Sequence, residues 1–299
     1  PTQRDTAPSE PSDYRRRPSS LAMKKSSNDA ALSWLADHEA VRAHCKQFKI
    51  EQRLEQGGGI ARITGFLPDH VAEACNAMVG GLSTSAWEPM CNEEEEGGSS
   101  VIEHNFSFAE PEDHPETLGL LADAVALLFP ALRPSFSVAA YGRGDCIHPH
   151  DDKVLTPTNP NPNPNPNPNP NRNPYPDPHD DKAHVMLADT SAGAAASGAE
   201  TGSETLHSRK YAGVLYLSKG WKSAWGGALV DLELEAEMVP AYNSLVVFEV
   251  PRMHFVAPVL SATRRRLSLF GWWLVPGQLY ELDAADGESE SDGEEGEEG

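Results

Sequence analysis

The sequence predicts a mainly β protein with flanking helices, in which a barrel or jelly roll of short strands carries N-terminal helices on its outside. Apolar residues at helical spacing occur before residue 130, and short apolar stretches separated by turn residues follow from residue 135. Hydrophobic residues make up 39% of the 299 residues, which is enough for one sizeable core. We therefore expect a single jelly-roll domain with its helices packed outside.

The helical pattern defines three segments of the N-terminal half. Helices are expected at residues 29–48, 67–78 and 118–128. Pro68 suits a first helical turn, and Pro130 ends the third helix. A short strand is expected at residues 60–66, and the four glutamates of residues 93–96 form an acidic loop before two glycines.

The strands of the C-terminal half are short and lie between turn signals. They are expected at residues 136–141, 211–217, 228–234, 244–250 and 265–274. Six consecutive Asn-Pro repeats at residues 159–170 interrupt this series. Proline lacks a backbone donor and has a fixed φ, so this tract cannot be a central strand and is expected to be an extended loop.

These features suggest one domain with three additions. The domain spans residues 29–280, and an Asn-Pro-rich disordered insertion at 154–207 interrupts it. Residues 1–28 form a basic disordered tail, and residues 281–299 form an acidic one.

The charge of the chain restricts its partners. The formal net charge is −21, and ten acidic residues in the C-terminal tail leave −11 on the remainder. An acidic chain is a poor candidate for direct binding of nucleic acid or of an anionic membrane, and a basic partner fits better.

The four cysteines include no CxxC pair and are expected to be free thiols of a reducing compartment, the cytoplasm or the nucleus. No apolar stretch approaches the ~20 residues of a membrane span.

The residue types expected at a ferrous iron centre occur in order along the chain. His150 and Asp152 form a His-x-Asp pair, which can direct both side chains at one metal if residues i and i+2 share a strand face. His254 follows the strand at residues 244–250 and supplies a second imidazole. Two histidines and one carboxylate leave three coordination positions on non-haem Fe(II). Arg266 and Ser268 share one face of the last strand, where an arginine can pair with a carboxylate.

These residues resemble the prolyl-hydroxylase-like branch of the 2-oxoglutarate/Fe(II)-dependent dioxygenase superfamily. The resemblance rests on Tyr141 to Gly144, His150 to Asp152, the Tyr-Leu strand at Tyr216, Trp221, Gly226 to Leu229, His254, and Arg266-x-Ser before Gly271. The form of these motifs looks most like the subgroup that hydroxylates a prolyl residue of a ribosomal protein. It covers about residues 57–275 without the insertion, and over fifty residues separate motifs that lie close together in relatives.

The resemblance implies a double-stranded β-helix that hydroxylates a prolyl residue of a protein substrate, a basic ribosomal protein in the nearest case. It implies that the protein uses Fe(II), 2-oxoglutarate and O2, and it also implies binding of L-ascorbate. The metal ligands would be His150, Asp152 and His254, and 2-oxoglutarate would meet Arg266, Ser268, Tyr141 and Tyr216. No catalytic residue is expected beyond these ligands.

Two choices of residue remain open at this stage. The sequence Pro-His-Asp-Asp-Lys occurs twice, so His179 and Asp181 are rivals of the first pair, and His148 is a weaker one because it lacks the carboxylate. The family spacing from Tyr141 favours His150 and Asp152. For the basic residue, the following serine favours Arg266 over Arg264 and Arg265.

Other functions are compatible with the same sequence. The barrel could be an oxygenase for a small molecule, or a non-catalytic pseudo-oxygenase that binds protein. A third hypothesis is hydroxylation of the chain's own Asn-Pro tract, because this tract follows the His-x-Asp pair.

Overall fold

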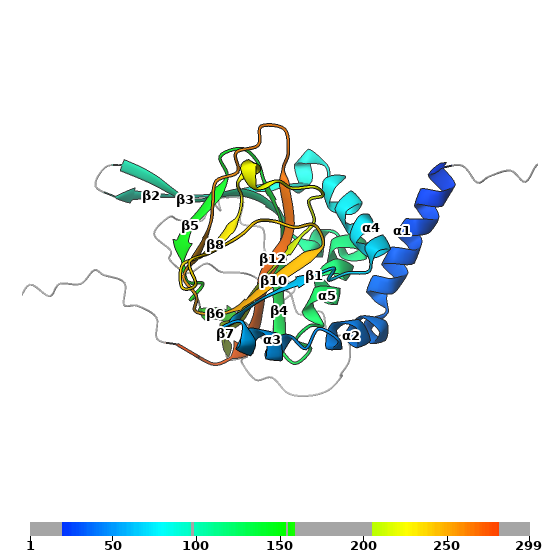
Figure 1. Cartoon of the computed structure of the whole chain (residues 1–299), viewed down its shortest axis with the longest axis horizontal. Helices are drawn as coiled ribbons and strands as arrows, with labels where there is room; N and C mark the ends of the chain where they lie inside the picture. Colours follow the sequence, from blue (N-terminus) through cyan, green and yellow to red (C-terminus); the bar gives the residue numbers. More distant parts are fainter. Residues whose placement is uncertain (1–19, 97–98, 154, 159–204, 281–299) are drawn as a thin grey trace, which may run out of the picture.

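A computed structural model describes residues 20–96, 99–153, 155–158 and 205–280 of the chain. These residues form a curled antiparallel sheet with helices on one side (Figure 1). The predicted fold class, a jelly-roll core with helices packed outside, is confirmed. None of the helices in this described part combines the length and the apolar character that crossing a bilayer demands.

The helices come first in the chain. They are α1 (Ser20–Ala36), α2 (His38–Lys46), α3 (Ile50–Gln56), α4 (Asp69–Gly80) and α5 (Leu120–Ala126). The single helix expected at residues 29–48 is wrong in two respects. Helix α1 begins at Ser20, inside the segment expected to be disordered, and the side chain of Asp37 accepts a hydrogen bond from the Ala40 N–H, which starts α2 as a separate helix.

The described strands all belong to one continuous sheet. They are β1 (Ile60–Thr64), β2 (Glu88–Glu96), β3 (Ser99–Ala109), β4 (Arg133–Tyr141), β5 (Cys146–His150), β6 (Leu155–Thr158), β7 (Thr205–Tyr216), β8 (Leu229–Asp231), β9 (Ala236–Met238), β10 (Ser244–Glu249), β11 (His254–Val256) and β12 (Arg266–Pro276). Their order is β1-β10-β7-β12-β4-β3-β5-β11-β8-β9, with β2 on β3 and β6 on β7.

Two segments expected to be irregular contain strands. Residues 93–96 belong to β2, which pairs with β3 in a hairpin that projects from the barrel, so the expected acidic loop is wrong (Figure 1). Glutamate has low strand propensity, and the pairing with β3 overrides it. Strand β6 lies at the beginning of the expected insertion and the start of β7 lies at its end, and these two segments pair with each other. The remainder of the insertion and the acidic tail lie outside the described residues. The second Pro-His-Asp-Asp-Lys copy, with His179 and Asp181, also lies outside them.

The central strands bury both of their faces. On β12, Leu267, Leu269 and Trp273 pack against the helices with the cluster that includes Leu35, Val71 and Leu121. The intervening side chains of Phe270 and Trp272 point into the barrel, beside Tyr141 and Tyr216. This alternation is the two-residue period of a strand, and it places Arg266 and Ser268 on the interior face.

The contact between Gly213 and Trp273 gives a test of this packing. A Cβ atom on Gly213 would lie 2.8 Å from Cζ3 of the fully buried Trp273, whose indole N–H donates to the Ala126 carbonyl at 3.1 Å. We expect Gly213→Ala to lower the free energy of unfolding by about 1–3 kcal/mol, since overpacking strains a filled core. Urea denaturation of the metal-free protein measures this change.

The control for this substitution is Gly80→Ala at the end of α4. There an added Cβ would lie 3.8 Å from Leu267 Cδ1, which is ordinary contact. Alanine should leave stability unchanged or raise it by about 0.5–1 kcal/mol, because glycine in a helix costs backbone entropy. Equal effects of the two substitutions would contradict the proposed packing.

Candidate active site

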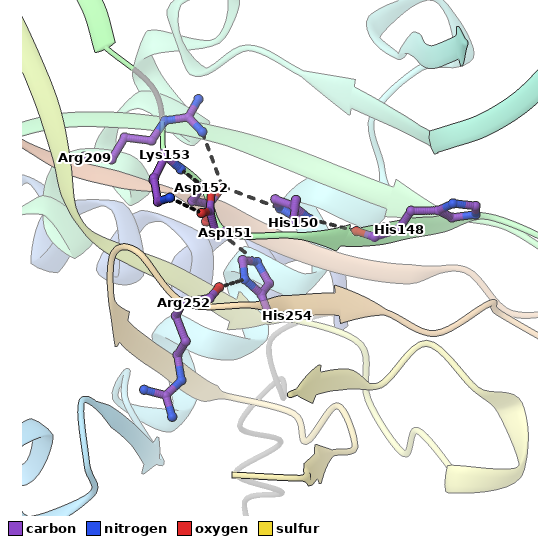
Figure 2. A network of polar contacts seen from close by, with 8 residues as sticks. All are labelled: His148, His150, Asp151, Asp152, Lys153, Arg209, Arg252 and His254. Carbon is purple, nitrogen blue, oxygen red and sulfur yellow. Dashed lines mark hydrogen bonds and ion pairs between the residues drawn. The ribbon is translucent and has the colours of Figure 1, made fainter. Parts of the chain in front are cut away.

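Two side chains from neighbouring strands and one from the turn after β5 meet at one point. Strand β5 ends at His150, which lies opposite His254 at the start of β11. Each of His150, Asp152 and His254 offers one ligand atom, and these atoms all lie within 4.8 Å of one another. Figure 2 shows the two imidazoles and the carboxylate pointing toward one another. The structure therefore brings together residues that are about one hundred positions apart in the chain.

Asp152 reaches this point by a route that strand alternation does not explain. The strand ends at His150, and Asp152 has a φ of 64° in the left-handed region, which aspartate tolerates better than most residues. Its Oδ1 lies 3.5 Å from His150 Nε2, and its Oδ2 lies 3.7 Å from His254 Nε2. The turn after the strand, rather than a shared strand face, aims the carboxylate at both imidazoles.

Backbone carbonyls orient both imidazoles. Nδ1 of His150 lies 2.8 Å from the His148 carbonyl, and Nδ1 of His254 lies 2.7 Å from the Arg252 carbonyl. A carbonyl only accepts, so each Nδ1 carries the proton and each Nε2 keeps a free lone pair. This is the arrangement that metal-binding histidines adopt. His148 itself is exposed, and it contributes its carbonyl rather than a ligand atom.

The protonation states of Asp152 and His254 also suit a metal. Burial disfavours the charged form of Asp152, but His150, Arg209 and His254 outweigh it and hold the pKa of this carboxyl well below its usual range. Burial lowers the pKa of His254, which keeps its imidazole neutral near pH 7. Burial acts in the same direction on His150, but the adjacent carboxylate of Asp152 outweighs it and raises the pKa of this imidazole. An ionised carboxylate and neutral imidazoles are the forms that bind divalent metals.

A second group of polar side chains lies on the interior face of three adjacent strands. Arg266 on β12 pairs in register with Tyr141 on β4, and Ser268 pairs with Tyr216 on β7. The guanidinium carbon of Arg266 lies 4.5 Å from the Tyr141 ring centroid and 5.1 Å from that of Tyr216. Arg264 and Arg265 are exposed outside this interior group. The structure thus brings together all four residues expected to meet 2-oxoglutarate.

Several polar atoms of this interior group are buried without partners. Among the described residues, no hydrogen bond reaches Nε or Nη1 of Arg266, Oγ of Ser268 or the hydroxyl of Tyr216. Arg266 is only 1% exposed, so its charge is almost completely shielded from water. Buried polar groups are costly unless they are paired, so these atoms fit an anionic ligand that accepts several hydrogen bonds.

Sequence reasoning missed three residues beside the triad. Arg209 contacts Asp152 directly, and Arg252 forms a buried ion pair with Asp231 at 2.7 Å while its carbonyl orients His254. His104 on β3 has its ring centroid 5.4 Å from that of His150. All three lie outside the motifs, and only the pairing of distant strands reveals their position.

The comparisons with known proteins agree with this geometry. Residues 196–274 match the model of the 2OG-Fe(II) oxygenase superfamily. The matched segment contains His254, Arg266, Ser268 and Tyr216 of the candidate site. His150 and Asp152 precede it, so their assignment rests on the geometry described above.

Two curated relatives match a short stretch of the chain. The chain is 38% identical over 82 residues to prolyl 3-hydroxylase OGFOD1 of Xenopus laevis, which is 23% of this chain and 16% of the relative. It is 36% identical over 84 residues to the Mus musculus protein of the same name, which is 24% of this chain and 15% of the relative. The matches thus span less than one fifth of these longer proteins.

Solved structures resemble the chain weakly. A prolyl 4-hydroxylase of Pseudomonas putida aligns with a TM-score of 0.41 and 19% identity, covering 82% of this chain and 97% of that chain. A prolyl hydroxylase of Trichoplax adhaerens, solved with a peptide fragment of the hypoxia inducible factor, aligns with a TM-score of 0.43 and 14% identity, covering 86% and 93%.

Proposed function

We propose that this chain is an Fe(II)- and 2-oxoglutarate-dependent oxygenase that hydroxylates prolyl residues of a protein substrate. The observation that carries the proposal is the convergence of His150, Asp152 and His254, together with a buried interior arginine that has unpartnered nitrogens. Two neutral imidazoles and one carboxylate are the donor set of non-haem Fe(II) oxygenases and leave three positions for other ligands. The donors present therefore fit ferrous iron.

In this proposal the chain holds its cosubstrate with the interior polar group. Arg266 would pair with the distal carboxylate of 2-oxoglutarate, and the hydroxyls of Ser268 and Tyr216 would donate to the same ligand. Tyr141 would form the wall beneath the guanidinium. The iron and 2-oxoglutarate supply the oxidation, in which 2-oxoglutarate becomes succinate and CO2 and the two atoms of O2 are divided between succinate and substrate. The protein orients a substrate C–H bond and excludes competing groups.

The relatives and the charge support the choice of substrate. Both curated relatives are named prolyl 3-hydroxylases. The net charge of −21 favours association with a basic protein, and we propose a ribosomal protein as the substrate, encountered in the cytoplasm or nucleus. The oxygenase domain would span residues 29–280, with the tails and the Asn-Pro tract as additions, and ascorbate would act as an auxiliary reductant.

Mass spectrometry tests the proposal directly. The full chain is incubated with Fe(II), 2-oxoglutarate, O2 and basic proline-containing peptides, and succinate and peptide masses are measured together. The proposal predicts succinate in proportion to one added oxygen atom on a prolyl residue. Succinate without an oxidised proline would reject the prolyl assignment and favour a small molecule. No succinate from a chain that binds Fe(II) and 2-oxoglutarate would favour a pseudo-oxygenase.

A peptide map of the enzyme after turnover separates substrate from self-modification. Unmodified prolines at residues 159–170, together with an oxidised added peptide, would exclude the Asn-Pro tract as the target.

A further inference from the structure

A buried arginine contacts the carboxylate of the candidate metal centre. Nη1 of Arg209 donates to Oδ1 of Asp152 at 3.3 Å, as Figure 2 shows. Arg209 is 9% exposed and Asp152 is 7% exposed, so water screens this ion pair little. The other carboxylate oxygen of Asp152, Oδ2, lies 3.7 Å from His254 Nε2. Arg209 thus holds one oxygen of the Asp152 carboxylate, while the other oxygen faces the imidazole of His254.

The guanidinium of Arg209 is itself held in place by stacking. Its central carbon lies 3.5 Å from the centroid of the Trp272 ring on β12. A planar guanidinium stacked on an indole loses little further freedom when it forms a hydrogen bond. Trp272 therefore limits the directions in which Arg209 can donate.

A β-bulge brings Arg209 to the interior face of the sheet. Tyr211 pairs with Trp273 of β12, but Leu274 pairs with Arg209, so the register shifts by one residue at Lys210. Without the shift, Arg209 would share the helix-facing side of the sheet with Tyr211, and Lys210 would point into the barrel. Bulges commonly redirect a side chain next to a site, and this one exchanges an exposed lysine for a buried arginine.

Asp152 depends on such an external contact for its orientation. It lies beyond the end of β5 with a φ of 64°, so no strand pairing constrains its side chain. Burial alone would favour a neutral carboxyl, whereas Arg209 and the two histidines keep the pKa low. The same contacts that keep the group ionised also fix where its oxygens lie.

We propose that Arg209 is a positioning residue that holds Asp152 in its metal-binding orientation. This inference rests on the proposed function, because it assigns Arg209 a role toward the metal that the triad binds. Groups that hydrogen-bond a metal ligand typically contribute 10–100-fold to metal affinity. A positive charge near the metal acts in the opposite direction, so the two contributions of Arg209 can be separated.

Metal binding by matched variants tests the inference. The affinity of metal-free full-length protein for Co(II) and Mn(II) is measured by titration, with the visible absorption of bound Co(II) reporting the coordination geometry. Arg209→Met removes the donor and the charge but keeps an apolar stem on Trp272, and should weaken binding about 10–100-fold with an altered Co(II) spectrum. Arg209→Gln keeps an N–H donor without the charge and should bind more tightly than Arg209→Met.

The control is Lys210→Met, which removes the same charge one residue away on the exposed side and should leave both affinities within about twofold. Trp272→Leu, which removes the stacking surface and no charge, should also weaken binding and covers the case in which Arg209→Met does not fold.

The outcomes separate this inference from the proposed function. Wild-type protein that binds neither metal would overturn both. Wild-type binding together with folded Arg209→Met of equal or higher affinity would overturn only the positioning role and identify the arginine as a counter-charge. Equal loss in Arg209→Gln and Arg209→Met would also exclude a hydrogen-bonding role.

Discussion

Replacing Asp152 by Asn is expected to weaken divalent metal binding by more than about a hundredfold and to abolish succinate formation. The carboxylate is the only anionic group among the three candidate ligands, and its loss should exceed the 10–100-fold cost of removing a partner outside the coordination sphere. Anaerobic titration with Fe(II) measures the affinity, and succinate release measures turnover.

The matched control for this substitution is the neighbouring carboxylate. Asp151 is one residue away, but its Oδ2 lies 3.1 Å from Lys153 Nζ and it is not one of the converging ligands. Asp151→Asn should retain metal binding and turnover within about threefold, since a partly exposed ion pair contributes about 1 kcal/mol or less. If both asparagine variants kept turnover, the proposed metal centre would be wrong.

Replacing Arg266 by Met is expected to impair 2-oxoglutarate binding and to stabilise the unliganded protein. Hydrogen bonds to charged groups contribute about 1.5–3 kcal/mol each, so losing two of them should weaken 2-oxoglutarate binding by roughly a hundredfold or more. Because the guanidinium is 1% exposed with two unpartnered nitrogens, its removal should leave the free energy of unfolding unchanged or raise it by about 1–4 kcal/mol.

Two measurements check the opposite directions of this prediction. The affinity for 2-oxoglutarate is measured without O2 in the presence of Mn(II), and stability is measured by urea denaturation without ligands. Arg264→Met serves as the control, because Arg264 is exposed and stacks on Trp225, outside the barrel interior. A variant that lost stability and kept its 2-oxoglutarate affinity would show that Arg266 is a structural residue.

Much of the candidate site could be predicted from local patterns. The alternation along residues 266–273 correctly separates the interior Arg266 and Ser268 from Leu267 and Leu269, because a strand has a period of two. The order of histidine, carboxylate, histidine and arginine predicts one chemistry, since few sites need these residue types together.

The same patterns failed where contacts are non-local. Residues 93–96 have a loop-like composition, yet they lie in a strand because β3 pairs with them. The helix expected at residues 29–48 divides at Asp37, whose side chain caps the second segment. Arg209 carries no recognisable signal, since a one-residue bulge decides which face it occupies.

By itself, the sequence determined the fold class, the interior face of the last strand and the residue types available for iron and an anionic cosubstrate. Only the tertiary structure decided that His150 lies opposite His254, that Asp152 turns back toward both, and that Arg209 holds that carboxylate. The reason is physical. Residue type and alternation act within a few residues of the chain, whereas the positions of ligand atoms depend on which distant strands pair and in which register.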